Sequence, residues 1–212
     1  MTSRIAILIS GRGSNMLALL DAARDGRIPG AEIALVVSDH ASAPGVSLAQ
    51  ERGVNTVVVE RGTMMRPAHI ARIGSILREH KIDLVCLAGF MRLLSFDFVA
   101  AFRGRIINIH PSLLPAFPGL HSHRQAIEYG VRVSGCTVHF VDETTDGGPI
   151  IEQRTVSVHD DDTEATLAAR ILVEEHKLYP EVVARIVSGE YKLQGRRVVH
   201  MQSQIAATQA QH

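Results

Sequence analysis

Apolar strands alternate with amphipathic helices along the first half of this 212-residue sequence, and the alternation restricts the possible folds more than any other feature. The first run, RIAILIS at 4–10, is typical of a strand that is buried on both faces. Strands connected by helices predict right-handed crossovers and therefore a mostly parallel sheet. Further strands are expected at 31–38, 54–59, 83–88 and 105–109, and helices at 15–24, 43–52 and 66–80.

The pattern changes in the second half of the chain. The sequence predicts a short helix at 122–129, strands at 133–141 and 149–156, a long helix from a Thr163 cap to near Ser188, and a hairpin at 191–199. Only the loop DETTDGG joins the two strands, which favours antiparallel pairing. We therefore expect a Rossmann-like α/β fold of three layers, with a mostly parallel central sheet and an antiparallel portion in the C-terminal half. Residues 1–200 should form one domain, and 201–212 a disordered tail.

Composition excludes several classes of protein. Lys and Arg together number 22, as do Asp and Glu, which argues against a general binder of nucleic acid or of acidic membranes. No apolar stretch approaches the ~20 residues that span a bilayer, and the first residues do not form a signal peptide. Cys86 and Cys136 lie in apolar runs and are expected to be buried thiols, which favours a reducing, cytoplasmic location.

The first strand leads into the loop SGRGSN and then a helix. Backbone N–H groups at a helix N-terminus attract anions, and Gly11 and Gly13 permit close approach of a ligand. Ser14 and Asn15 add hydrogen-bonding side chains. The loop is neither a Walker motif nor the complete dinucleotide fingerprint, because Met16 stands at a required glycine position. It predicts a phosphate site, although a plain tight turn has a similar sequence.

Asn108 and His110 are two residues apart at the end of a predicted buried strand, so their side chains point to one face. The amide of Asn108 could stabilise an oxyanion, and the imidazole of His110 could transfer a proton near neutral pH. Asp146, in the loop DETTDGGP, could lie beside His110 and favour its imidazolium form. The alternatives are a strand cap, a structural histidine and an ordinary acidic turn.

Glu175 falls on the apolar stripe of the long helix, together with Leu167, Ile171, Leu178 and Val182. A carboxylate among apolar side chains needs a partner or a ligand. The sequence leaves a structural ion pair and a contact to a substrate amine or hydroxyl equally open.

Histidine is abundant, with 11 residues, but its arrangement does not predict a metal site. His121 and His123 form one possible pair of ligands. No Cys/His or HExxH arrangement, of the kind that binds zinc, accompanies this pair.

Three segments resemble the phosphoribosylglycinamide formyltransferases of purine biosynthesis: AGFMRLLS, NIHPSLLPAFPGLHSHRQA and VHFVDETTDGGPII. The similarity extends from the first strand to about Val187. Methionyl-tRNA formyltransferases share the SLLP loop but add a C-terminal RNA-binding domain, and formyltetrahydrofolate deformylases add an N-terminal regulatory domain. The segment GLHSHRQA and the extent of the chain favour the glycinamide branch.

The resemblance implies transfer of a formyl group from 10-formyltetrahydrofolate to the amine of glycinamide ribonucleotide, without a metal. It implies that Asn108 and protonated His110 stabilise a tetrahedral oxyanion and that Asp146 sets the state of His110. The implied ribonucleotide site consists of Gly13, Ser14, Asn15 and Glu175. The implied folate site consists of Arg66, Met91, Arg92, Leu93, Leu94, Asn108, Val141 and Asp142.

The sequence departs from the family pattern near Arg66, because Ile70 stands where an acidic residue is common and Pro67 alters the start of the helix. The resemblance also implies that residues 1–100 hold the phosphate and 101–200 the folate, in a monomer or homodimer. Two alternatives stay open: hydrolysis of formyltetrahydrofolate by the same residues, and a folate- or nucleotide-binding module without turnover.

Overall fold

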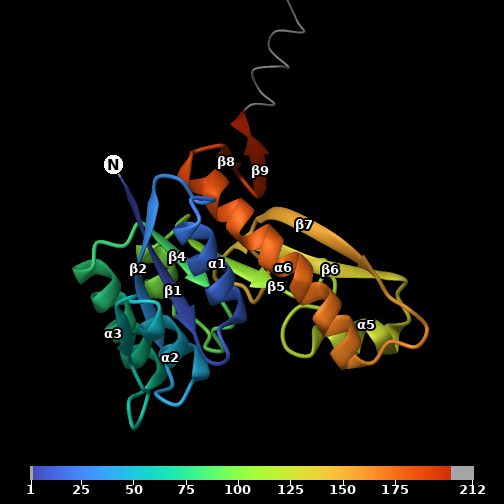
Figure 1. Cartoon of the computed structure of the whole chain (residues 1–212), viewed down its shortest axis with the longest axis horizontal. Helices are drawn as coiled ribbons and strands as arrows, with labels where there is room; N and C mark the ends of the chain where they lie inside the picture. The colour runs from blue at the N-terminus through green and yellow to red at the C-terminus, as the bar shows by residue number, and fades with distance from the viewer. Residues whose placement is uncertain (1, 202–212) are drawn as a thin grey trace, which may run out of the picture.

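One sheet of seven strands forms the centre of the described chain in the computed structural model, which describes residues 2–201 (Figure 1). The strand order is β3-β2-β1-β4-β5-β6-β7. The five N-terminal strands pair in parallel and the last two pair antiparallel, so both parts of the predicted sheet are confirmed. The strands are β1 (Ser3–Ile9), β2 (Ala31–Ser38), β3 (Thr56–Val58), β4 (Leu84–Leu87), β5 (Ile106–His110), β6 (Val133–Phe140) and β7 (Ile150–Ser157).

Helices cover both faces of the sheet, which gives the three expected layers. Ile5, Ile7 and Ile9 of β1 pack with α1 and α6, whereas Ala6 and Leu8 pack with α3 and α4 on the opposite face. This division follows from the two-residue period of a strand. The helices are α1 (Ser14–Arg24), α2 (Pro44–Glu51), α3 (Arg66–Glu79), α4 (Phe96–Ala101), α5 (Ser122–Tyr129) and α6 (Glu164–Val187).

Most predicted elements are confirmed to within two residues. Helix α4 was not expected, because six residues are too few to show a helical period; Ser95 caps it by accepting a hydrogen bond from the Phe98 N–H. Strand β3 is shorter than the predicted 54–59. Thr163 caps α6 in a capping box with Thr166, as predicted, and the helix continues through Pro180.

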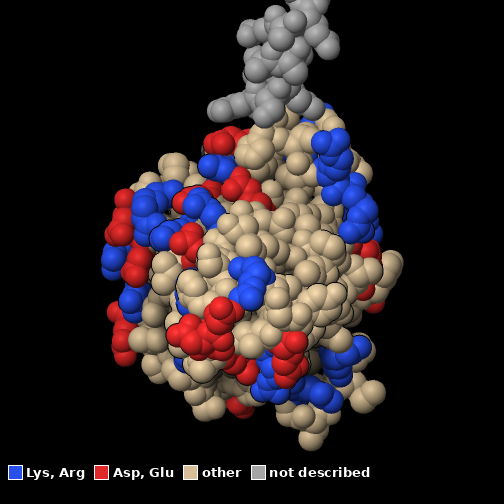
Figure 2. All heavy atoms as spheres, turned by 90° about the vertical axis from the view of Figure 1, so that its right-hand side faces the viewer, with Lys and Arg blue, Asp and Glu red and all other residues tan. Residues whose placement is uncertain are grey.

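The C-terminal part of the described chain forms the predicted hairpin. Strands β8 (Tyr191–Gln194) and β9 (Arg197–His200) pair antiparallel beside β7. The predicted disordered tail lies, apart from Met201, outside the described residues. None of the helices in the described part combines the length and the hydropathy that a membrane span requires. The face of the molecule around β6, β7 and α5 carries interspersed acidic and basic side chains beside a broad uncharged area (Figure 2).

The parallel strands place their carboxyl ends at one edge of the sheet, where open α/β sheets bind ligands. The loops that follow β1, β2, β4 and β5 leave from this edge. Strand β6 runs in the opposite direction and ends beside Ile107. The connection from β6 to β7 must therefore fold back to reach the same edge.

Candidate active site

His110 ends β5 and is 5% exposed. Its Nδ1 lies 3.3 Å from the Oδ2 of Asp146, and its Nε2 lies 2.9 Å from the carbonyl oxygen of Phe117. Both partners are acceptors, so the doubly protonated imidazolium can donate at both nitrogens. The structure thus confirms the predicted proximity of Asp146 and His110.

Two groups hold the Oδ2 of Asp146 in place, the His110 ring and the Gly119 N–H. The Gly119 N–H donates to Oδ2 at 2.8 Å, and Oδ1 lies 3.7 Å from His139 Nε2. The residue has φ +50°, an uncommon conformation for a side chain that is not glycine. At Gly148, a Cβ would lie 1.9 Å from the carbonyl oxygen of Phe140, so this glycine is needed for the loop itself to fold back.

Asn108 is half-buried and lies on the same face of β5 as His110, as the strand period predicted. The alternate residues Ile107 and Ile109 lie on the other face, where they pack toward α1 and α6. Its Nδ2 donates to Nε2 of His139 at 3.2 Å. His139 is buried and makes its other ring contact, through Nδ1, to the carbonyl oxygen of Phe140 at 2.9 Å.

His139 is a site residue that the sequence analysis missed. Burial lowers its pKa, partly offset by the hydrogen bond to Phe140 and by the charge of Asp146. A neutral ring with its proton on Nδ1 accepts from Asn108 and so orients that amide. The antiparallel register that sets His139 opposite Asn108 was the missing information.

The loop after β5 is braced by its own hydrogen bonds. The Ser112 hydroxyl donates to the carbonyl oxygens of Ala116 at 2.6 Å and of Phe117 at 3.3 Å. Thr137 of β6 links the same loop, because its hydroxyl donates to the Ser112 carbonyl oxygen and accepts from the Leu114 N–H. These contacts hold the Phe117 carbonyl against His110.

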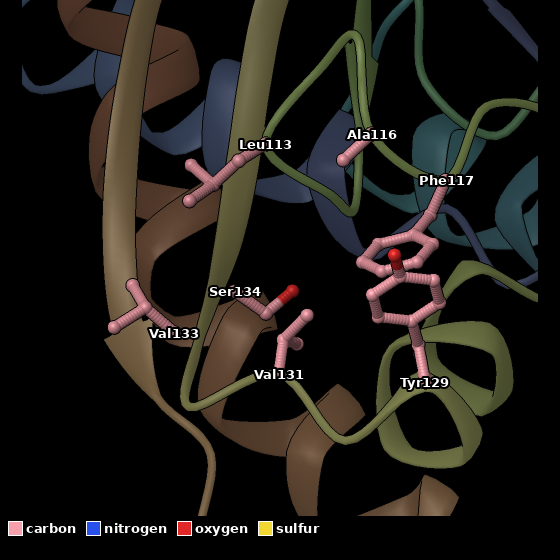
Figure 3. A pocket seen from close by; sticks show the side chains of 7 residues that line it. All are labelled: Leu113, Ala116, Phe117, Tyr129, Val131, Val133 and Ser134. Atoms are coloured by element: carbon pink, nitrogen blue, oxygen red, sulfur yellow. The ribbon is translucent and has the colours of Figure 1, made fainter.

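A cavity of about 410 Å³ is lined in part by this loop (Figure 3). Its walls are mostly apolar, and the rings of Phe117 and Tyr129 meet edge to face there, with centroids 5.8 Å apart. The buried Ser134 hydroxyl points toward the cavity and has no hydrogen-bond partner. None of the residues expected to act in the chemistry lines it, so we do not place the reaction there. The lining residues are Leu113, Ala116, Phe117, Tyr129, Val131, Val133 and Ser134.

The predicted phosphate loop leads into α1 with geometry suited to an anion. Gly13 is the N-cap, with φ +76°, and no side chain caps the first turn. The N–H groups of that turn therefore remain available to a ligand, and Ser14 stands at their start.

Glu175 of α6 finds its partner in the same loop. Asn15 Nδ2 donates to Glu175 Oε2 at 2.6 Å, and Glu175 is 6% exposed. Burial raises the pKa of Glu175, although the hydrogen bond from Asn15 acts in the opposite direction. The partner is thus an amide and not the cation of an ion pair. The Oδ1 of Asn15 is buried and finds no hydrogen-bond partner among residues 2–201, which leaves an acceptor for a ligand.

The segment expected to meet the folate follows β4 and exposes two apolar side chains, Met91 at 63% and Leu93 at 56%. The Met91 N–H donates to Ser10 Oγ at 2.9 Å and is therefore not free for a ligand. Arg92 donates to Asp39 at 2.5 Å. Leu94 is partly buried against the core on the α3 side.

The other expected folate residues are less tightly grouped. Val141 packs against the same core, and Asp142 accepts hydrogen bonds from the N–H and hydroxyl of Thr144 at 2.8 and 2.5 Å. Arg66 begins α3 and is exposed, and it contacts no partner by hydrogen bond or ion pair within residues 2–201. In the same part of the chain, no group of three or more His, Cys, Asp and Glu side chains is arranged to hold a metal ion.

Residues 3–183 match the family model described as "Formyl transferase", and the chain belongs to this family. The phosphoribosylglycinamide formyltransferase of Escherichia coli is 42% identical over 190 residues, which cover 89% of each chain. The crystal structure of glycinamide ribonucleotide transformylase 1 from Symbiobacterium toebii matches with a TM-score of 0.92 and 48% identity, over 94% of each chain. These relatives place the chain in the phosphoribosylglycinamide formyltransferase branch of the family.

A human relative is much longer. The trifunctional purine biosynthetic protein adenosine-3 is 45% identical over 192 residues, which cover 90% of this chain but only 19% of that protein. The chain thus spans about a fifth of that relative's length.

Proposed function

We propose that this chain transfers the formyl group of 10-formyltetrahydrofolate to the amine of glycinamide ribonucleotide, as a cytoplasmic enzyme of purine biosynthesis. One observation carries the proposal: His110 contacts Asp146 where the sheet edge and the folded-back loop join, Asn108 lies on the same face of β5, and His110 faces acceptors at both ring nitrogens. The full-length similarity to the Escherichia coli formyltransferase supports it.

The amine nitrogen would attack the formyl carbon, forming a C–N bond while the carbonyl oxygen takes the electron pair as an oxyanion. Asn108 would donate an N–H to this oxygen, since His139 holds its amide in a fixed orientation. The Nε2 proton of His110 is available for the oxyanion, because Nδ1 faces Asp146. Binding would replace the Phe117 carbonyl as the partner of Nε2. The C–N bond to the folate then breaks, and the proton lost by the amine reaches the folate nitrogen.

The ribonucleotide would bind along the β1–α1 loop. Its phosphate would accept from the N–H groups at the start of α1 and from Ser14, with Gly13 permitting the approach. Asn15 and Glu175 would contact the aminoacyl ribose part. A buried carboxylate with one amide partner has remaining capacity to accept from an amine or hydroxyl.

The folate would bind against the segment from Met91 to Leu94 and the opposing wall of Val141 and Asp142. The exposed side chains of Met91 and Leu93 offer apolar surface for a flat ring system. Arg66, at the exposed start of α3, would meet the acidic tail of the folate.

The test is a steady-state assay of purified protein with 10-formyl-5,8-dideazafolate and glycinamide ribonucleotide, following loss of the formyl group. We expect turnover that requires the amine and disappears in His110→Ala. His159→Ala serves as the matched control, because His159 is exposed and both of its hydrogen bonds among the described residues, one donated by its N–H and one accepted by its carbonyl oxygen, involve the backbone and not the ring. Loss of formyl without the amine would indicate a hydrolase, and ligand binding without any product would indicate a binding module.

A further inference from the structure

A buried carboxylate directly after β2 has no role in the chemistry proposed above. The side chain of Asp39 is 0% exposed, at the ligand-binding edge of the sheet. Its Oδ2 accepts from Arg92 Nε at 2.5 Å, and Arg92 Nη2 lies 3.1 Å from His40 Nε2. A buried carboxylate is expensive unless it is paired, so the pair with Arg92 is what makes this position tolerable.

Arg92 lies in a segment that is neither helix nor strand, so the backbone conformation of this segment depends on contacts with its neighbours. Besides the ion pair of Arg92, two hydrogen bonds connect this segment to the end of β1. The Met91 N–H donates to Ser10 Oγ at 2.9 Å, and the Ser10 N–H donates to the Gly89 carbonyl oxygen at 3.1 Å. The ion pair between Arg92 and Asp39 is the third contact, and it connects the segment to the end of β2.

The guanidinium of Arg92 is thereby held toward the end of β2. Its Nε and one terminal nitrogen face Asp39 and His40, whereas the side chains on either side of it, Met91 and Leu93, stay exposed. An anchored residue between two exposed apolar ones sets the direction in which those two project.

We propose that Asp39 is a positioning residue for the formyl donor. Through Arg92 it fixes the backbone from Met91 to Leu94, and with it the apolar surface against which the folate lies. The inference rests on the proposed function, which puts the folate against this segment. It assigns Arg92 to the support of the site and not to direct contact with the folate.

Asp39→Asn tests the proposal, because it keeps the shape of the side chain and removes the charge. We expect the KM for the formyl donor to rise about tenfold, with kcat and the KM for the ribonucleotide changed by less than about twofold. Arg92 is 31% exposed in its side chain, so water can solvate it and the variant should fold. Glu32→Gln is the matched control, since it removes the exposed pair with Arg4 near the other end of β2.

A double-mutant cycle separates support from direct contact. If Arg92 acts through Asp39, then Arg92→Gln in the Asp39→Asn background should raise the donor KM little further. Equal effects of Arg92→Gln in both backgrounds would show direct contact with the donor and overturn the assignment. Circular dichroism melting of each variant checks that the chain is folded.

Calorimetric titration with 10-formyl-5,8-dideazafolate gives a readout that does not depend on turnover. Weaker binding to Asp39→Asn than to the parent protein and to Glu32→Gln would support the inference. Unchanged binding to Asp39→Asn would overturn the inference and leave the proposed function standing. Absence of donor binding by the parent protein would instead overturn both.

Discussion

Replacing Asp146 with asparagine should reduce turnover far more than it reduces substrate binding. The carboxylate lies 3.3 Å from Nδ1 of His110, and an ion pair at that separation is worth about 5 kcal/mol at an effective dielectric constant of ~20. Asparagine keeps an acceptor for the Gly119 N–H, so the loop should hold its shape while the charge is lost. Since desolvation offsets part of the attraction, we expect kcat to fall by about 10²- to 10³-fold, or about 3–4 kcal/mol of activation free energy.

Steady-state kinetics with both substrates measures this effect. Asp160→Asn is the control, because Asp160 is exposed and its ion pair within the described part of the chain is with Arg132. If Asp146 acts through His110, then Asp146→Asn should have little further effect in a His110→Ala background. A kcat near that of the parent protein, or an equal loss in both backgrounds, would refute the reasoning.

Three further predictions concern stability and reactivity. Burial raises the pKa of Glu175, so the folded chain binds this proton more tightly than the unfolded chain does. The stability that this carboxyl contributes is therefore present below its ordinary pKa and lost as pH rises through the raised value; Glu175→Gln should flatten that decline in urea unfolding as pH rises above the ordinary pKa of 4.5, and an unaltered slope would contradict this. Burial raises the pKa of Cys86 and of Cys136 to about 12 each, so Ellman's reagent should label neither thiol until denaturant is added, and rapid labelling of the native protein would argue otherwise. Ser134→Ala removes a buried hydroxyl without a partner, and thermal melting should show a change in unfolding free energy within about 1 kcal/mol or a gain; a large loss would reveal an interaction that we have not identified.

Local patterns were sufficient for most of the fold. The apolar runs and the helical stripes predicted nearly every strand and long helix. Burial on both faces of a parallel sheet requires a continuous apolar run in each strand, which can be recognised in each segment separately. The shared face of Asn108 and His110 also followed from the strand period alone. Helix α4 and the short length of β3 could not be predicted from local patterns, because so few residues show too little of the period.

The composition of the site needed contacts between distant segments. Asp146 was a candidate from its loop, but β6 runs away from the sheet edge, and only the folded-back loop brings its carboxylate to His110. The register of β6 against β5 sets His139 opposite Asn108, and the sequence of neither strand predicts that register. The ion pair of Arg92 with Asp39 likewise joins two segments that are far apart in the chain.

Sequence patterns were enough to predict the succession of most strands and helices, the class of fold and the residues able to do acid–base chemistry. Those properties depend on period and side-chain type, which are local. Only the folded chain shows which acceptors surround His110, that Glu175 pairs with the amide of Asn15, and that Arg92 pairs with Asp39. Each of these contacts joins residues far apart in the chain, and their meeting depends on the packing of whole elements against one another.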